Sequence, residues 1–488
     1  MEIIDYDLIS VQEARILAEN AREASKSMLS FPQEKLDEIV KSMVHGVSGH
    51  VKELAVMSSE ETEYGKWEDK LVKNRFVCEA LPPKLSGMRC VGVIFEDKDK
   101  KVMDVGVPLG VIVALPPATS PVSTVIYKAL IAVKSGNAII FSPHPRARGT
   151  ICRALDLLIE AAEGAGLPKG GISCMRNVTG SGTVELMNHP ATSLIMNTGV
   201  PGMLDAANRS GKPVIYGGAG NGPVFIERTA DIMQAAADIV ASKTFDNGIV
   251  SAAEQSIIVD RPVACEAKKA LVEHGAYFME REEAKALGAL FFFENGRTNP
   301  EMVGISAKDL ARRAGFTVPD HAKVLISEEK YISSSKDDPY LKEKLCPVMA
   351  YYVEDDWMGA CEKCIELLLS EKQGHTLVVH TGDEEVVRQF ALKKPVSRVL
   401  VNTPAAFGGM GATTNLFPAM TLGSGSAGYG ITSDNVSPMN LIYIRKVGFG
   451  VRKIETVVNK GGRNAKNGNE SLITLYNILQ KMQKEHII

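Results

Sequence analysis

The feature that most constrains the fold is a succession of short, continuous apolar runs separated by helical segments. The first run, GVIVAL from Gly110, is followed by a helical pattern from Val122 to Lys134 and a second run at 137–142. Strands that are apolar on both faces and alternate with helices form parallel sheets covered on both sides. Further strands are expected at 171–175, 193–197, 213–216, 256–259, 324–326, 348–353, 376–379 and 399–401. The sequence therefore predicts a two-lobed α/β protein that binds ligands at the carboxyl edge of a parallel sheet.

The segments outside these two series have a different character. Ser10-Val11-Gln12-Glu13 has the pattern of a capping box, which predicts a helix from there to about Lys26. Segment 90–108 predicts a hairpin, two β-rich runs around a charged tip, completed by a late strand at 441–444. Residues 459–488 begin with a polar linker, NKGGRNAKNGN. One face of a short helix then carries Leu472, Leu475, Tyr476, Leu479 and Met482.

Composition excludes several classes of protein. The chain has 488 residues, a net charge of -3 and a pI near 6.4, without the basic stripe of a nucleic-acid-binding protein. The start, MEIIDYDLIS, lacks the basic and apolar regions of a signal peptide, and no apolar run approaches a membrane span. Cys361 and Cys364 form a lone C-x-x-C in a helical pattern, so we expect no metal site. The expected protein is cytoplasmic and binds neither nucleic acid nor membrane.

The candidate nucleophile is Ser251. It lies in the segment SKTFDNGIVSAAEQS, from Ser242 to Ser256, between a helical pattern and an apolar strand. A glycine-bearing turn in this place can expose one side chain at a cleft, and here that side chain is Ser251. From the local pattern alone, an ordinary helix-to-strand connection is the favoured interpretation of the segment.

Six other motifs accompany this segment in a specific order. They are LPPATSP from Leu115, FSPHPRA from Phe141, TGVPGM from Thr198, GAGN from Gly218, EKLCPV from Glu343 and LGSGS from Leu422. Together, over roughly residues 10 to 450, they resemble the CoA-acylating aldehyde dehydrogenases, including the aldehyde dehydrogenase half of the bifunctional alcohol/aldehyde enzymes. The resemblance implies a Rossmann-type nucleotide-binding lobe at 1–228 and a smaller α/β catalytic lobe at 229–404. Residues 405–458 would return to the first lobe, and 459–488 would form the linker and terminal helix.

The resemblance also implies a reaction, in which an aldehyde, coenzyme A and NAD (or NADP) give an acyl-CoA and the reduced nucleotide. Hydrolytic relatives activate water with a glutamate beside a glycine pair, but here that place is Tyr216-Gly217-Gly218-Ala219-Gly220. Without a base for water, a thiol acceptor is the sensible partner. By the same analogy the nucleotide would lie near Pro117, His144, Gly180, Gly182, Thr198, Gly199 and Gly218, with Glu343 on the nicotinamide-side ribose. Glycines at 180 and 182 would let backbone amides approach a phosphate.

Two departures from the family fall on the chemistry itself. Ser251 stands where the family has its cysteine nucleophile, and Ser120 stands where an asparagine side chain stabilises the oxyanion. A thiol ionises near pH 8.5, whereas an alkoxide needs a base, and no histidine or lysine is obviously placed for this. Loss of an oxyanion donor typically costs about a hundredfold in rate. We therefore expect impaired catalysis with Ser251 and Ser120 in the catalytic positions.

Three hypotheses stay open from the sequence. The chain is an acylating aldehyde dehydrogenase of reduced activity, a member with altered chemistry, or an inactive relative that binds nucleotide or coenzyme A or has a structural role. The resemblance implies dimers or tetramers. The terminal helix, about 469–488, resembles the peptides that direct enzymes into bacterial microcompartments, although a helix docked on its own or a neighbouring subunit has the same pattern.

Overall fold

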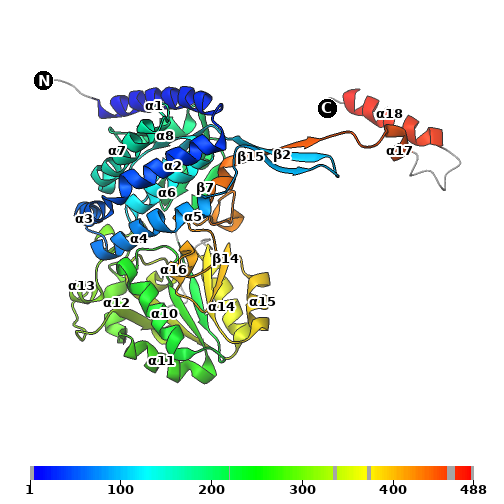
Figure 1. Cartoon of the computed structure of the whole chain (residues 1–488). Coiled ribbons are helices and arrows are strands. Elements are labelled where there is room, and N and C mark those ends of the chain that lie inside the picture. The colour runs from blue at the N-terminus through cyan, green and yellow to red at the C-terminus, as the bar shows by residue number, and fades with distance from the viewer. Residues whose placement is uncertain (1–4, 219, 333–337, 371–374, 459–467, 485–488) are drawn as a thin grey trace. The chain divides into compact units, whose positions relative to one another are not determined.

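The computed structural model describes residues 5–218, 220–332, 338–370, 375–458 and 468–484. The chain divides into two compact units. The first comprises Met1–Gly92 and Val107–Tyr443 and contains both lobes, and the second comprises Val93–Gly106 and Ile444–Ile488. Each unit is considered by itself below (Figure 1).

The first lobe is built on a five-stranded parallel sheet with the order β5-β4-β3-β6-β7. The strands are β3 (Val111–Leu115), β4 (Ala138–Phe141), β5 (Ile172–Cys174), β6 (Thr192–Thr198) and β7 (Val214–Gly217). The helices are α1 (Tyr6–Met28), α2 (Gln33–Ser48), α3 (Val51–Thr62), α4 (Trp67–Glu79), α5 (Leu81–Leu85), α6 (Pro121–Lys134), α7 (Arg148–Gly164), α8 (Gly180–Asn188) and α9 (Leu204–Arg209).

Alternate residues of each central strand enter different cores. Val111 and Val113 pack with α1, α8 and α9, whereas Ile112 and Ala114 pack with α2, α6 and α7. Both faces of the sheet are therefore covered, which explains the continuous apolar runs in the sequence. The cluster around Ile112 also contains residues of the second lobe, among them Phe245, Ile249 and Val250.

The first helix begins earlier than its sequence pattern predicts. Asp5 caps α1, accepting a hydrogen bond from the Leu8 amide at 3.0 Å. Ser10 is instead buried inside the helix, where its hydroxyl accepts from the Thr179 amide at 3.2 Å. The expected capping box at Ser10 is thus wrong, because this serine side chain is used for packing between α1 and the start of α8.

The second lobe holds a seven-stranded parallel sheet with the order β10-β11-β12-β9-β8-β13-β14. Its strands are β8 (Pro223–Ile226), β9 (Ser256–Asp260), β10 (Ala276–Phe278), β11 (Val324–Glu328), β12 (Val348–Glu354), β13 (Thr376–His380) and β14 (Arg398–Val401). The helices are α10 (Ile232–Thr244), α11 (Ala264–Glu273), α12 (Arg281–Gly288), α13 (Ala307–Arg313), α14 (Trp357–Ser370), α15 (Glu384–Lys393) and α16 (Ala405–Met410). A short 3-10 turn, η3 (Phe245–Gly248), follows α10.

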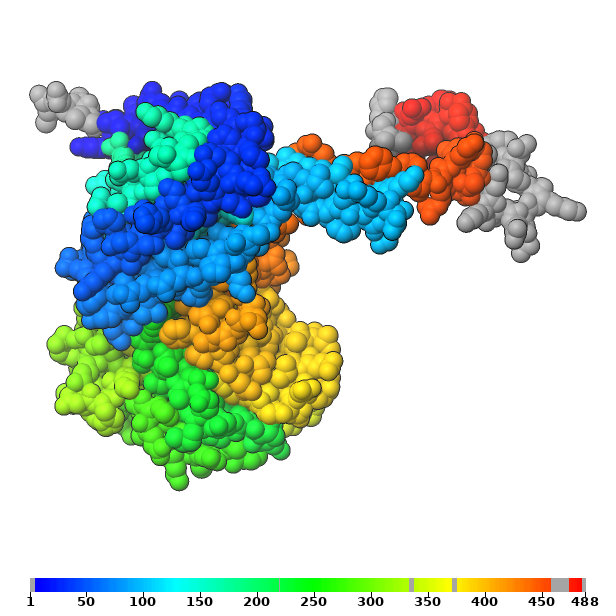
Figure 2. Space-filling view, in the orientation of Figure 1, coloured from blue at the N-terminus to red at the C-terminus, as the bar shows by residue number. Residues whose placement is uncertain are grey.

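This lobe differs from expectation in two respects. The lobe predicted to be the smaller holds the sheet with more strands. In addition, β8 lies before the expected boundary at 228 yet pairs with β9 and β13 of this sheet. Helix α4 of the first lobe contacts η3 of the second, and Figure 2 shows this side of the first unit, with α4 in blue and the second lobe from green through yellow to orange.

The second unit contains most of a three-stranded sheet with the order β1-β2-β15. The strands are β1 (Gly92–Asp97), β2 (Val102–Pro108) and β15 (Ile442–Gly448), so the hairpin and its late third strand form as predicted. Helices α17 (Ile454–Val458) and α18 (Gly468–Lys484) follow. Among the helices that the structure describes, none is long and apolar enough to cross a bilayer.

Candidate active site

The residues expected to bind nucleotide follow successive strands of the five-stranded sheet. Pro117 comes after β3, His144 after β4, Gly180 after β5, Thr198 at the end of β6 and Gly218 after β7. Because these strands are parallel, their carboxyl ends share one edge of the sheet. The topology therefore brings this predicted set to a single edge.

Two of the expected residues meet where the strand order reverses, between β3 and β6. A Cβ added to Gly199 would lie 3.3 Å from the Cβ of Pro117. Beside them the Thr198 hydroxyl contacts that of Thr421 at 3.0 Å. Open α/β sheets bind ligands in the crevice at such a reversal.

The glycines of α8 have different surroundings. A Cβ on Gly182 would lie 1.9 Å from the Oγ of Ser10, so glycine is required there for the close approach of α1. Gly180 has no such neighbour, since a Cβ there would meet nothing within 4 Å. The close packing of α1 thus explains why residue 182 is glycine. At residue 180 no neighbouring atom is close, so the start of α8 has open space beside it. Their nucleotide contacts stay a prediction.

His144 caps a turn at the same edge. Its Nδ1 accepts a hydrogen bond from the Arg146 amide at 3.2 Å. Burial, and then the nearby Arg146 guanidinium, lower the pKa of His144. The ring is therefore neutral near pH 7, with Nδ1 an acceptor.

The second group of expected residues lies at the amino edge of the seven-stranded sheet. Ser251 precedes β9, Gly220 precedes β8 and Glu343 precedes β12. His375, which the sequence argument did not single out, directly precedes β13. The four segments converge because their strands are neighbours in the order β12-β9-β8-β13.

Gly220 is the junction of this group. A Cβ there would lie 1.6 Å from the carbonyl oxygen of Ser251 and 3.0 Å from Nε2 of His375. The Gly220 amide donates to Oε1 of Glu343 at 2.7 Å. Only glycine allows these segments to approach so closely, so the structure brings Ser251, Glu343 and His375 together around one backbone position.

His375 is a buried imidazole with one unused nitrogen. Its Nδ1 contacts the Thr376 hydroxyl at 2.7 Å, while Nε2 has no hydrogen-bond partner among the residues described. Burial, together with the Arg398 guanidinium, lowers its pKa to about 3. The ring is neutral across the physiological range and can accept a hydrogen bond at Nε2.

The loop that carries Ser251 begins with a run of left-handed residues. Asp246, Asn247 and Gly248 have φ angles of 50°, 52° and 75°. Such a run is strained for the first two and persists only when tertiary contacts impose it. Here the Asp246 amide donates to Oδ2 of Asp69 at 2.8 Å, and its Oδ1 accepts from the Lys66 amide at 2.7 Å.

Two buried lysines complete the hold on this loop. Lys70 and Lys73, on α4, approach Oδ2 of Asp246 at 3.1 and 2.5 Å. Burial alone would raise the pKa of Asp246, but the two ammonium groups outweigh it and lower the pKa. Burial also lowers the pKa of Lys70 to about 8, against the opposing effect of Asp246. The carboxylate therefore stays ionised between two cations.

The same cluster reaches the expected oxyanion position. Lys73 Nζ donates to Oγ of Ser120 at 2.6 Å, and the carbonyl of Thr119 accepts from both lysines at 3.3 Å. Lys73 thus joins the carboxyl edge of one sheet to the loop before β9 of the other. Sequence reasoning missed this lysine because a charged residue on a helix is normally solvent-exposed.

A carboxyl group lies buried just beyond Ser251. Glu254 Oε1 accepts from the Ala405 amide at 2.9 Å, whereas Oε2 has no partner within the described part of the chain. Burial raises its pKa to about 7. Glu254 therefore changes its charge near neutral pH, close to the candidate nucleophile in the chain.

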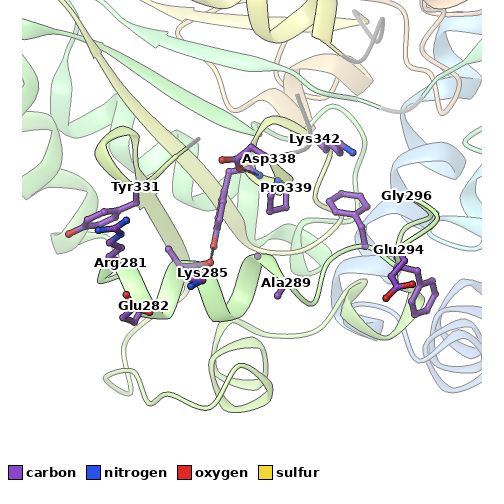
Figure 3. A pocket seen from close by; sticks show the side chains of 15 residues that line it. Arg281, Glu282, Lys285, Ala289, Glu294, Gly296, Tyr331, Asp338, Pro339 and Lys342 are labelled. Carbon is purple, nitrogen blue, oxygen red and sulfur yellow. Dashed lines mark hydrogen bonds between the residues drawn. The ribbon is translucent and has the colours of Figure 1, made fainter. Parts of the chain in front are cut away.

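A cavity of about 580 Å³ lies elsewhere in the second lobe (Figure 3). Arg281 and Lys285 of α12, with Ala289 directly after that helix, line one side of it, and Pro339 and Lys342 lie across from them. Its lining includes none of the sequence-predicted site residues. We therefore place the candidate active site between the two sheet edges rather than in this cavity.

Comparisons with known proteins show the family of the chain. Residues 2–291 match the model of the aldehyde dehydrogenase family. The chain belongs to this family. It is 39% identical over 438 residues to the bifunctional aldehyde-alcohol dehydrogenase AdhE of Escherichia coli, covering 89% of this chain and 49% of the relative. The chain therefore spans about half the length of the curated relatives it matches first.

Solved structures match over nearly the whole chain. A probable aldehyde dehydrogenase from Listeria monocytogenes is 47% identical with a TM-score of 0.90, covering 93% of this chain and all of that one. An acetylating aldehyde dehydrogenase from Geobacillus thermoglucosidasius is 40% identical with a TM-score of 0.89, covering 93% and 99%. The predicted aldehyde dehydrogenase-like fold and the resemblance to the acylating branch are confirmed.

More distant members extend this picture. A Rhodopseudomonas palustris propionaldehyde dehydrogenase with bound propionyl-CoA is 26% identical with a TM-score of 0.80, covering 89% of this chain and 94% of that one. A propionaldehyde dehydrogenase from a Clostridium phytofermentans bacterial microcompartment is 27% identical with a TM-score of 0.79, covering 90% and 97%.

Proposed function

We propose that this aldehyde dehydrogenase is of the CoA-acylating type, converting an aldehyde, coenzyme A and NAD(P)+ into an acyl-CoA and NAD(P)H. The convergence of Ser251, Glu343 and His375 on Gly220, at the amino edge of the larger sheet, carries the proposal. Acylating relatives of near-identical fold support it. The segment 216–220, where hydrolytic relatives have a glutamate, contains no carboxylate in its sequence.

The protein groups fit a nucleotide. The edge that carries His144, Gly180 and Gly199 has open space at Gly180, at the start of a helix where backbone amides favour a phosphate. Glu343, already bonded to the Gly220 amide, would lie on the ribose side. When bound, the nucleotide accepts hydride from the aldehyde carbon. NAD and NADP are both compatible with these residues.

The residues around position 251 would carry out nucleophilic addition to the aldehyde and acyl transfer to coenzyme A. A nucleophile there adds to the aldehyde carbon, and loss of hydride to the nucleotide leaves an acyl group on it. The thiol of coenzyme A then attacks the acyl carbon, takes the acyl group and releases the enzyme nucleophile. Neutral His375, with Nε2 unused among the described residues, can accept a hydrogen bond from the thiol, while its low pKa makes it a weak proton acceptor. Ser251 adds slowly because its hydroxyl needs a base to ionise, so turnover in this chain is expected to be impaired.

The test is reduced-nucleotide formation with coenzyme A and short aldehydes, comparing the parent chain with Ser251→Cys. Nucleotide binding to both proteins controls for folding. We expect turnover with Ser251→Cys and little with the parent. If the parent chain turns over without the Ser251→Cys change, the serine must be activated by another group. Binding without turnover in either protein would favour the alternative function, a nucleotide- or CoA-binding protein without catalysis.

The terminal helix supports a second, separable proposal. In α18 the side chains of Leu475, Tyr476 and Leu479 are 57%, 63% and 46% exposed. We propose that this apolar face binds another protein surface, and a microcompartment shell is one such surface, since one relative comes from such a compartment. Deleting residues 461–488 should abolish co-sedimentation with shells while leaving nucleotide binding intact. Unchanged co-sedimentation would refute this role.

The three-stranded sheet is proposed as a contact between copies of the chain. Val93 and Phe95 of β1 are 44% and 52% exposed, and Ile444 of β15 is 40% exposed. Apolar side chains exposed together on one small sheet indicate an interface. We expect a dimer or tetramer, which Phe95→Lys should dissociate in sedimentation analysis. An unchanged assembly would exclude this sheet.

A further inference from the structure

We propose that Lys73 is a positioning residue that makes Ser120 an oxyanion donor, replacing the asparagine side chain that this position has in the family. The inference rests on the proposed function for its substrate. It concerns a contact that the sequence did not reveal, the 2.6 Å hydrogen bond from Lys73 Nζ to Ser120 Oγ.

The direction of this bond determines where the serine proton points. A hydroxyl has one hydrogen to donate and two acceptor positions. Lys73 is an ammonium donor, since it pairs with Asp246 at 2.5 Å, so it occupies an acceptor position of Oγ. The serine hydrogen must therefore point away from Lys73. In the described structure, Ser120 Oγ makes this one hydrogen bond and no cap to α6, which leaves its hydrogen available.

Ser120 lies where such a donor is useful. It follows β3 at the edge of the crevice, it is half-buried, and the side chain of Lys73 behind it is only 1% exposed. A hydroxyl polarised from behind by a buried cation is a stronger donor than a hydroxyl in water. Fixed donors of this kind stabilise the charge that develops on a carbonyl oxygen during nucleophilic addition.

The cluster also fixes the geometry of that donor. Asp246 holds Lys73 from the loop that leads to Ser251, so the same side chain contacts the donor and the nucleophile loop. Lys70 provides a matched comparison. It pairs with the same carboxylate and the same Thr119 carbonyl, but its bonds do not include Ser120. Either lysine alone leaves Asp246 paired.

The experiment uses the full chain with Ser251→Cys as its background. Lys73→Met, Lys70→Met and Ser120→Ala are each added to this background singly. A further variant combines Lys73→Met with Ser120→Ala. The first readout is kcat and KM for reduced-nucleotide formation. The second is acylation of the introduced thiol by p-nitrophenyl acetate, which forms a tetrahedral oxyanion but needs no nucleotide, aldehyde or coenzyme A. Thermal unfolding and nucleotide binding report on folding.

We expect Lys73→Met to lower kcat and the acylation rate by roughly tenfold or more, within the range for a weakened oxyanion donor, with KM little changed. Lys70→Met should leave both rates within about threefold, because Lys73 still pairs with Asp246 and still donates to Ser120. In the Ser120→Ala background, Lys73→Met should cause no further loss, because the two residues act as one unit. Ser120→Asn, which supplies its own amide donor, should make the rate insensitive to Lys73→Met.

Three results would overturn the inference: equal effects of the two lysine substitutions, an undiminished effect of Lys73→Met without Ser120, or no acylation of the thiol. If nucleotide reduction fails but acylation shows the predicted coupling, the proposed function fails and the role of Lys73 stands. Should Lys73→Met not fold, Lys73→Gln retains a neutral N–H donor toward Ser120. It should then lose activity, but less than Ser120→Ala, and no loss at all would count against the polarising cation.

Discussion

Replacing Asp246 by asparagine isolates the charge at the centre of the buried lysine cluster. Asp246 Oδ2 accepts from Lys70 and Lys73, whose side chains are 3% and 1% exposed. An amide can present its oxygen to the lysines or to the Lys66 amide, but not to both, and it carries no charge. Asp246→Asn therefore leaves two buried ammonium groups without a counterion.

The expected loss of stability in Asp246→Asn follows from the burial of the two lysines. Breaking a buried ion pair by removing one partner typically costs about 3–5 kcal/mol. An unfolding entropy of about 2.1 cal/mol/K per residue amounts to roughly 1 kcal/mol/K for a chain of this length, so the unfolding midpoint should fall by about 3–5 °C if the chain unfolds as one unit.

Scanning calorimetry at two pH values tests this account. Burial already lowers the pKa of Lys70 to about 8, and without Asp246 that pKa falls further. A lysine whose pKa is lower in the folded state gains stability as pH rises, so the deficit of Asp246→Asn should shrink between pH 7 and 9. Asp320→Asn, which removes an exposed pair with Lys308, is the control and should leave the midpoint unchanged. An unchanged midpoint for Asp246→Asn at pH 7 would refute the reasoning.

Two further predictions concern other buried positions. Burial raises the pKa of Glu254 to about 7, so the folded state keeps a proton that the unfolded state releases near pH 4.5, and stability falls as pH rises from about 5 to 7. Glu254→Gln should flatten this part of the unfolding-midpoint profile, and parallel profiles would contradict it. Gly182→Ala should destabilise the chain by about 1–3 kcal/mol in urea titrations, because its Cβ would overlap Ser10, whereas Gly180→Ala has open space. Equal midpoints for the two alanine variants would contradict it.

The order and type of most central elements were predictable because local sequence carries their signal. The run from Gly110 forms β3 because each of its residues enters a covered face. β8 was missed because it is short and follows a glycine-rich stretch that resembles a turn. α1 was placed too late, because a serine suited to capping is equally suited to packing beside Gly182.

Fewer residues of the candidate site than of the fold could be predicted from the sequence. Motif order predicted Ser120, Ser251 and Glu343 as site residues, but each motif is local. Lys73 and Asp246 are 173 residues apart in sequence, and nothing in WEDKLVKNRF distinguishes a buried lysine from the usual exposed one. His375 likewise acquires its place only when β13 pairs beside β8. Such partners become visible only through the tertiary fold.

The core cluster shared by the two lobes has a consequence for how the crevice works. Phe245, Ile249 and Val250, which flank the left-handed run, are side chains of the same core as Ile112 and Leu130 of the first lobe. Opening the lobes like a hinge would expose these three, at about 1.5–3 kcal/mol for each large side chain. Separating the lobes is therefore costly, and we expect substrates to reach position 251 along the crevice without a hinge opening of the two lobes.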